Sequence, residues 1–381
     1  MIGIAPQETE DRGGPGGPAS TGILFAAFLG AGIGAALPGA MLPLLLARWS
    51  LTDAQAGGLF FLFFVGSASG ALLSRGLLSR SIVRGCLTTA LGAVLLALAS
   101  RLAAFVAITA YGVGLGIVMT SISLLQSRRD PANRVVQMAR LNLVWSIGAC
   151  LGPSIALRGA AAFSPQAMLY ALSAYFLLAT AVASRWAPNA NAAVVGPSPG
   201  RVAGIPPLLL LLVPLATGIE SAAGGWLATY SKRSGETLGV TVGAATCFWA
   251  GMLFSRLLQS HRQTSVPKRW MLILGPSAMS VALILVLSTT TPSAILTGAL
   301  LLGLGVGPMY PLLLALALRH GEGRNLIFVI AGAGASFLPL LTGLVSGWAG
   351  SLRTGLGVPL LGALTMTCLG WAQSSFERRE A

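Results

Sequence analysis

The chain has 381 residues, of which 55% are hydrophobic and 9% are charged, and its formal net charge is +14. Soluble globular proteins carry about 25% charged residues, and the mean hydropathy of +0.80 confirms a strongly apolar composition. These values exclude an ordinary soluble enzyme or binding domain. They indicate a protein that crosses a membrane several times.

The N-terminal residues 1–20 come before the first long apolar stretch and contain Pro6, Pro15 and Pro18 among several glycines. A cleavable signal would place a basic segment before a short apolar core, and that pattern is missing here. We therefore interpret residues 1–20 as a disordered tail on the cytoplasmic side.

Apolar stretches long enough to cross a bilayer core of about 30 Å recur along the rest of the chain. We count twelve of them, separated by short polar breaks, and they predict an all-α membrane protein. The predicted spans are 21–46, 54–74, 82–100, 103–127, 136–157, 165–185, 206–229, 238–257, 270–289, 293–318, 325–348 and 354–374.

Residues 187–205 divide the chain near its midpoint and hold prolines, asparagines and glycines without a periodic apolar pattern. This composition is typical of a linker. We expect an N-terminal six-helix bundle over 21–186 and a C-terminal bundle over 206–376, with the linker on the cytoplasmic side.

Three short patterns recur in the two halves, at offsets that differ by only ten positions, and they indicate a duplicated six-helix unit. The stretch from Gly70 to Arg75 resembles the stretch from Gly251 to Arg256. Further matches join Gly112, Gly114 and Gly116 to Gly303, Gly305 and Gly307, and the pair Gly148 and Pro153 to the pair Gly334 and Pro339.

The lysines and arginines are unevenly divided between the two sides of the predicted membrane. Eighteen of the 24 lie on the side of the termini and six on the other. Cytoplasmic loops of membrane proteins carry such an excess, so we expect a multi-pass protein of the inner (plasma) membrane with both termini in the cytoplasm. A nucleic-acid partner would need one contiguous basic face instead.

Residues suited to metal binding or catalysis are few. The four cysteines stand singly in apolar stretches, both histidines fall in predicted loops, and no phosphate-binding glycine loop is present. Metal sites and membrane-embedded enzymes need several polar groups close together. We expect no enzyme activity, no metal, no cofactor and no obligate protein partner.

Twelve spans, cytoplasmic termini, a central linker and the turn from Gly70 to Arg75 resemble the major facilitator superfamily over essentially the whole chain. The family's turn reads Gly-x-x-x-Asp-Arg-x-Gly, and here Ser74 replaces the acid. The resemblance implies transport by alternating access. We expect Arg75 and Arg256 to act as gating residues that cap helices or pair with Asp130 and Glu322, the alternative being that they reach towards lipid phosphates.

Glu220 is the one acid of ten within a predicted span, because the others, Asp53 and Asp130 included, fall in tails or short loops. An ionisable group at membrane depth costs about 2.5 to 3.5 kcal/mol or more and marks a functional site by default. The alternative is an acid that fixes the packing of the seventh span. Proton coupling, if present, would fall to Glu220 alone.

The seventh span places Trp226 and Tyr230 on the same half of a helix as Glu220. A carboxylate and aromatic rings are the groups that hold a sugar, although both aromatics could instead belong to an interfacial belt. The pattern Gly-x-Glu-x-x-x-Gly-Gly-Trp-x-x-x-Tyr is similar to the fucose permease-like branch of the superfamily. That resemblance implies a sugar substrate and proton symport.

Three further residues complete the predicted substrate site. Asn142 and Trp145 lie three apart in the fifth span and so share one face of a helix. Tyr310 lies between Pro308 and Pro311, where a kink is expected. We therefore predict a secondary transporter of a small hydroxylated solute, with a lipid bilayer around it. The alternatives are an uncoupled facilitator and an exporter of amphipathic, drug-like compounds, which the Gly152-Pro153 step favours.

Overall fold

A computed structural model of the chain describes residues 18–74, 77–129, 134–186, 206–261, 268–317 and 324–380. In these ranges it contains twelve helical segments long and apolar enough to cross a membrane. The predicted all-α fold with twelve spans is therefore confirmed. The predicted linker, Arg75 and residues 1–17 lie outside the described residues, whereas residues 18–20 of the predicted tail belong to the first helix.

Ten spans are single helices, and the tenth and twelfth are each built from two consecutive helices. The tenth consists of α10 and α11, and the twelfth of the short α13 followed by α14. The bounds are α1 (Pro18–Trp49), α2 (Asp53–Leu73), α3 (Leu78–Leu98), α4 (Ala103–Arg129), α5 (Arg134–Ala162), α6 (Pro165–Trp186), α7 (Pro207–Arg233), α8 (Leu238–His261), α9 (Lys268–Ser288), α10 (Pro292–Val306), α11 (Met309–Ala317), α12 (Arg324–Ala349), α13 (Leu352–Gly355) and α14 (Gly357–Glu380).

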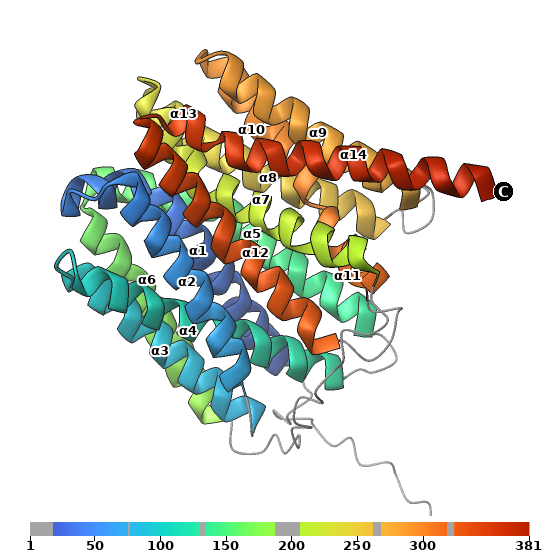
Figure 1. Ribbon diagram of the computed structural model, residues 1–381. Coiled ribbons are helices and arrows are strands. Elements are labelled where there is room, and N and C mark those ends of the chain that lie inside the picture. Colours follow the sequence, from blue (N-terminus) through green and yellow to red (C-terminus); the bar gives the residue numbers. More distant parts are fainter. Residues whose placement is uncertain are drawn as a thin grey trace, which may run out of the picture.

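The helices run back and forth between two ends of the molecule (Figure 1). We call the end with the α1–α2, α7–α8 and α12–α13 connections the distal end. The opposite end, where α1 begins and α14 finishes, is the proximal end. The distal connections are short, since α1 ends at Trp49 and α2 begins at Asp53.

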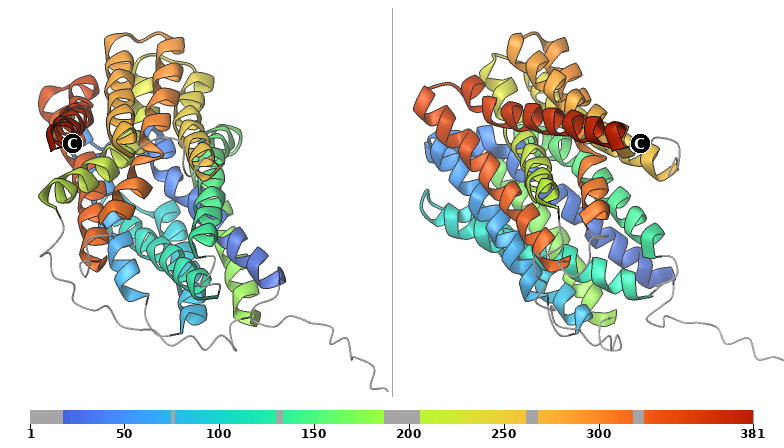
Figure 2. Two further views of the ribbon diagram at one scale, coloured as in Figure 1. Left: turned by 90° about the vertical axis from the view of Figure 1, so that its right-hand side faces the viewer. Right: turned by 45° about the vertical axis from the view of Figure 1, so that its right-hand side comes forward.

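Helices α1 to α6 pack mainly with one another, as do α7 to α14 (Figure 2). The two halves meet where α1 packs on α7, α2 on α12, and α5 on α8. Large aromatic side chains such as Trp226, Phe248 and Tyr111 are fully buried within this arrangement. A site between the halves must therefore be built from these six helices.

The glycines of the repeated patterns lie at close crossings between helices. A Cβ on Gly70 would collide with a backbone carbonyl of α4, and one on Gly251 would collide with a carbonyl of α10. In the same way Gly148 faces α1, and Gly334 faces the equivalent helix α7. Small residues let helix backbones approach this closely within a membrane, so the repeat preserves the same crossings in both halves.

The tenth span is interrupted at Gly307 and Pro308, between the end of α10 at Val306 and the start of α11 at Met309. Proline lacks the amide hydrogen that a continuous helix needs and its ring clashes with the preceding turn. The break lies next to Tyr310, where the sequence predicts a kink. Pro311 removes the amide hydrogen that the carbonyl of Gly307, four residues earlier, would accept in a continuous helix, so this carbonyl can accept a side-chain hydrogen bond.

Candidate functional site

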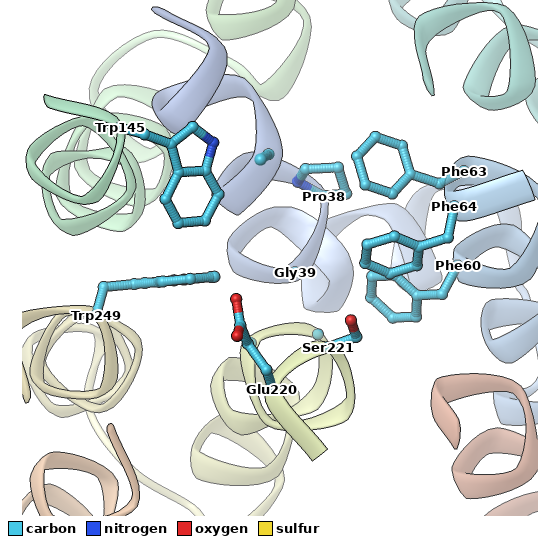
Figure 3. Close-up of a pocket in the computed structure, with 12 residues that line it drawn as sticks. Pro38, Gly39, Phe60, Phe63, Phe64, Trp145, Glu220, Ser221 and Trp249 are labelled. Atoms are coloured by element: carbon cyan, nitrogen blue, oxygen red, sulfur yellow. The ribbon is translucent and has the colours of Figure 1, made fainter. Parts of the chain in front are cut away.

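Glu220 lies in the middle of α7 and lines a cavity between the two halves (Figure 3). Helices α1, α2 and α5 of the first half and α7 and α8 of the second supply its walls. The lining residues are Ala35, Pro38, Gly39, Phe60, Phe63, Phe64, Trp145, Glu220, Ser221, Gly224, Gly225 and Trp249.

Aromatic rings form two opposite walls of the cavity. Figure 3 shows Trp145 and Trp249 on one side, three phenylalanines of α2 on the other, and the carboxylate of Glu220 directed between them. The rings of Trp145 and Trp249 meet edge to face with centroids 5.7 Å apart. Since Trp145 comes from α5 and Trp249 from α8, this wall joins the two halves.

The floor of the cavity exists because α1 and α7 come very close there. A Cβ on Gly39 would collide with the backbone carbonyl of Gly224, and one on Gly225 would press against the ring of Phe60. The glycines around Glu220 therefore pack helices together, which is one of the two roles that their small size permits.

Arg256 of α8 is the cation that accompanies Glu220. Its Nη2 lies 3.8 Å from Oε2 of Glu220, and the two side chains are 12% and 19% exposed, respectively. Its Nη1 donates to Oγ of Ser146 at 3.0 Å, and its Nε donates to the carbonyl of Gly307 at 3.3 Å. The guanidinium also lies over the ring of Trp145, 5.7 Å from the centroid.

This geometry leaves the carboxylate with capacity to bind something else. A charge-assisted hydrogen bond between nitrogen and oxygen spans about 2.7–2.9 Å, so the separation of 3.8 Å between Glu220 and Arg256 is an ion pair without a tight hydrogen bond. The guanidinium is instead held by Ser146 and Gly307. A donor on a solute could reach Glu220 while these two bonds persist.

The aromatic residues predicted to bind a sugar lie in different places, some at the cavity and some in the protein interior. Trp145 lines the cavity, and its indole N–H is buried with no hydrogen-bond partner among the described residues. Trp226 does not line this cavity: its N–H donates to the carbonyl of Pro339 at 3.2 Å, and its ring packs on Phe60. Tyr230 donates to the carbonyl of Val286 at 2.9 Å, near the distal end.

The other two predicted residues, Asn142 and Tyr310, do not line the cavity. Asn142 is exposed on α5, one turn before Ser146, and its backbone carbonyl accepts a hydrogen bond from the Ser146 hydroxyl. Tyr310 lies near enough to Glu220 and Arg256 to interact electrostatically with both. It therefore belongs to the surroundings of the ion pair.

The structure gives Arg256 an acidic partner that the sequence did not predict. Glu220, inside the membrane-spanning part, lies at ion-pair distance from it. The expected capping role is seen, because Gly307 is the C-cap of α10 and its carbonyl accepts from Arg256. The suggested partners Asp130 and Glu322 lie outside the described residues, as does Arg75.

Several lining residues escaped the sequence analysis. Phe60, Phe63 and Phe64 occupy positions i, i+3 and i+4 of α2, which places them on one helix face. In a chain so apolar, that spacing equally fits a face buried among neighbouring helices, so it did not single them out. Ser146 gave no signal either, because its role depends on Arg256 of the other half.

The described part of the chain contains no cluster of three or more His, Cys, Asp or Glu side chains that could hold a metal ion. The site consists of one carboxylate, one guanidinium, a serine hydroxyl at the cavity wall and aromatic rings. These groups can bind and release a solute or a proton.

Comparison with known proteins identifies the family. Residues 23–325 match the sequence model of the Major Facilitator Superfamily. The chain belongs to this superfamily. Its members are membrane transporters, and the predicted resemblance is confirmed at this level. No curated protein sequence matches the chain.

Solved transporter structures share the fold at low sequence identity. A bacterial homolog of the human lysosomal transporter Spinster, inward-facing and unoccupied, is 12% identical with a TM-score of 0.73, covering 94% of this chain and 97% of that one. The peptide transporter POT in complex with sulfate is 13% identical with a TM-score of 0.75, covering 97% and 96%. FucP in the outward conformation is 16% identical with a TM-score of 0.60, covering 93% and 98%.

Proposed function

We propose that this chain is a secondary transporter that binds a small amphipathic solute beside Glu220 and moves it by alternating access. The observation that carries the proposal is the position of Glu220. It is an acid inside the membrane-spanning part, and it faces a cavity walled by helices of both halves. A group so costly to bury is typical of a substrate or ion pathway.

The chemistry of the walls supports an amphipathic solute. Five aromatic rings line the cavity, whereas Glu220 and Ser221 are the lining residues with hydroxyl or carboxyl groups. Ligand sites pair such apolar walls with a few polar groups that fix orientation. A flat apolar body between the rings, with one hydrogen-bond donor directed at Glu220, fits this lining. That substrate class corresponds to the amphipathic compounds of the alternative prediction.

A sugar is the second candidate, and the two tryptophans favour it. Trp145 and Trp249 flank the carboxylate, where their rings offer flat apolar faces. A monosaccharide, however, carries several hydroxyl groups, and each one buried without a partner costs about 1–3 kcal/mol. The small number of polar lining groups therefore places sugars second.

The cavity must widen to admit either solute. Its volume is about 70 Å³, well below the roughly 300 Å³ at the lower end for ligand pockets. The walls belong to different halves, so separation of the halves would enlarge it. This is the movement that alternating access requires.

Proton coupling at Glu220 is part of the proposal. Within the described spans the acids are Glu220 and Asp53, and Asp53 is bonded to Arg233 at the distal end. Protonation of Glu220 would release Arg256 from its charge partner. An uncoupled facilitator would use Glu220 for solute binding only. We further propose that the arginine-rich proximal end faces the cytoplasm.

Uptake into proteoliposomes tests these proposals. The panel contains labelled monosaccharides and small aromatic amines, measured with and without an inward-directed proton gradient. We expect uptake of an amphipathic solute that Glu220→Gln reduces. The control Glu236→Gln removes an acid of the α7–α8 connection and should retain uptake. Sugar uptake without amine uptake would reverse the order of the candidates, and no uptake of either would refute the substrate proposal.

A further inference from the structure

Three polar side chains from both halves meet at the distal end. Asp53, expected in a loop, is the first residue of α2, Arg233 is the last residue of α7, and Ser346 lies near the end of α12. The two guanidinium nitrogens Nη1 and Nη2 of Arg233 donate to the two carboxylate oxygens of Asp53, each at 2.6 Å. The Ser346 hydroxyl donates to the same carboxylate at 2.5 Å.

This cluster differs from an ordinary exposed ion pair. Each nitrogen of the fork binds one of the two carboxylate oxygens, and this paired geometry fixes orientation as well as charge. The Asp53 side chain is only 10% exposed, although that of Arg233 is 44% exposed. A capping box formed by Thr52 and Gln55 fixes the start of α2, and a carboxylate in the first turn is favoured by the helix dipole.

The backbones beneath the cluster are in close contact. A Cβ on Gly343 of α12 would collide with the backbone carbonyl of Asp53, and one on Gly57 would press on the carbonyl of Leu340. The same crossing continues to Gly347, which lies against Ala54. The distal ends of α2 and α12 therefore cannot separate by side-chain movement alone. Opening requires that the bonds of Asp53 break.

We infer that Asp53, Arg233 and Ser346 form the distal gate of the transport cycle. Asp53 belongs to the first half, and both of its partners belong to the second. The bonds hold the distal end closed in the conformation described here and break when the cavity opens to that side. This inference rests on the proposed alternating access.

Helix α7 connects this gate to the cavity. Glu220 and Arg233 lie thirteen residues apart on one continuous helix, a distance of about 20 Å at 1.5 Å per residue. Any tilt of α7 that accompanies solute binding at Glu220 therefore moves Arg233 relative to Asp53. The middle of α7 at Glu220 and its distal end at Arg233 therefore move together, whereas an ion pair within one half would not respond to solute binding.

Accessibility of the cavity from the distal side tests the gate without any substrate. All four native cysteines are replaced, and Ala35→Cys places a thiol in the cavity wall. Intact cells and inside-out vesicles are treated with a membrane-impermeant maleimide. Thr290→Cys, in the exposed α9–α10 connection, identifies which preparation presents the distal end.

We expect Asp53→Asn and Arg233→Gln to raise the labelling rate at position 35 from the distal side by at least about tenfold, since each loses hydrogen bonds to a charged group. Ser346→Ala should give a smaller increase. The double variant Asp53→Arg with Arg233→Asp exchanges the two charges and should lower the labelling rate at position 35 part of the way back. Arg101→Gln is the matched control, because Arg101 bonds to Gln55 within the first half.

Unchanged labelling in Asp53→Asn, Arg233→Gln and Ser346→Ala would overturn the gate, as would an equal increase in Arg101→Gln. If one charge variant does not fold, the other and Ser346→Ala decide the result. Labelling and uptake fail independently: a gate response without uptake of any panel solute would refute the substrate proposal and retain the gate.

Discussion

Arg256 neutralises Glu220, and Arg256→Gln tests how strongly the fold depends on that pairing. At 3.8 Å and an effective dielectric constant of about 20, the attraction between the two charges is about 4 kcal/mol. Removing one partner of a buried pair typically costs about 3–5 kcal/mol, because the remaining charge is uncompensated. The bonds to Ser146 and Gly307 are lost as well. We expect the free energy of unfolding to fall by at least about 3 kcal/mol.

The assay is a double-mutant cycle in detergent, with unfolding followed by intrinsic tryptophan fluorescence. Glu220→Gln added to Arg256→Gln should recover part of the lost stability, since a neutral amide at position 220 needs no counter-charge. Arg140→Gln removes an exposed arginine of α5 and should leave the unfolding midpoint unchanged. Simple addition of the two single effects would refute a direct interaction between Glu220 and Arg256.

Three further predictions concern packing and the cavity wall. Gly39→Leu should abolish folding or transport, because the new side chain would collide with α7. Gly22→Leu has open space around it and should be tolerated. Expression and uptake assays compare the two variants. Trp249→Ala removes a cavity wall and should raise the KM for uptake several-fold; an unchanged KM would remove Trp249 from the site. Tyr230→Phe loses one buried hydrogen bond and should cost about 1 kcal/mol of stability without changing KM.

The sequence was sufficient to predict the fold because membrane spans leave a strong local signal. Runs of apolar residues and the prolines at 308 and 311 mark the spans and the interrupted tenth helix without any tertiary information. The predicted ends of the spans were less accurate than their number. α1 continues to Trp49 and α5 to Ala162, beyond the predicted 46 and 157, because a helix can extend past the apolar core of the bilayer.

The site was predicted only where one residue was unusual by itself. Glu220 stands out as an acid in an apolar span, and Trp145 lies near it in the cavity. Trp226 shares a helix half with Glu220, yet its ring packs on Phe60 of α2 and its N–H bonds to Pro339 of α12, so it lies in the interior. Interhelical contacts, such as that of Arg233 with Asp53, depend on how the two halves pack, and a single sequence does not encode that packing in any local pattern.

Binding of the transported solute at Glu220 can be measured directly by equilibrium titration of purified protein with the panel compound that gives uptake. The compound is titrated into wild type, Glu220→Gln and the control Glu236→Gln. A hydrogen bond to a charged group contributes about 1.5–3 kcal/mol, so Glu220→Gln should weaken affinity by about tenfold or more, and Glu236→Gln should bind as wild type does. Equal affinity in wild type and Glu220→Gln would contradict the placement of the solute beside this carboxylate.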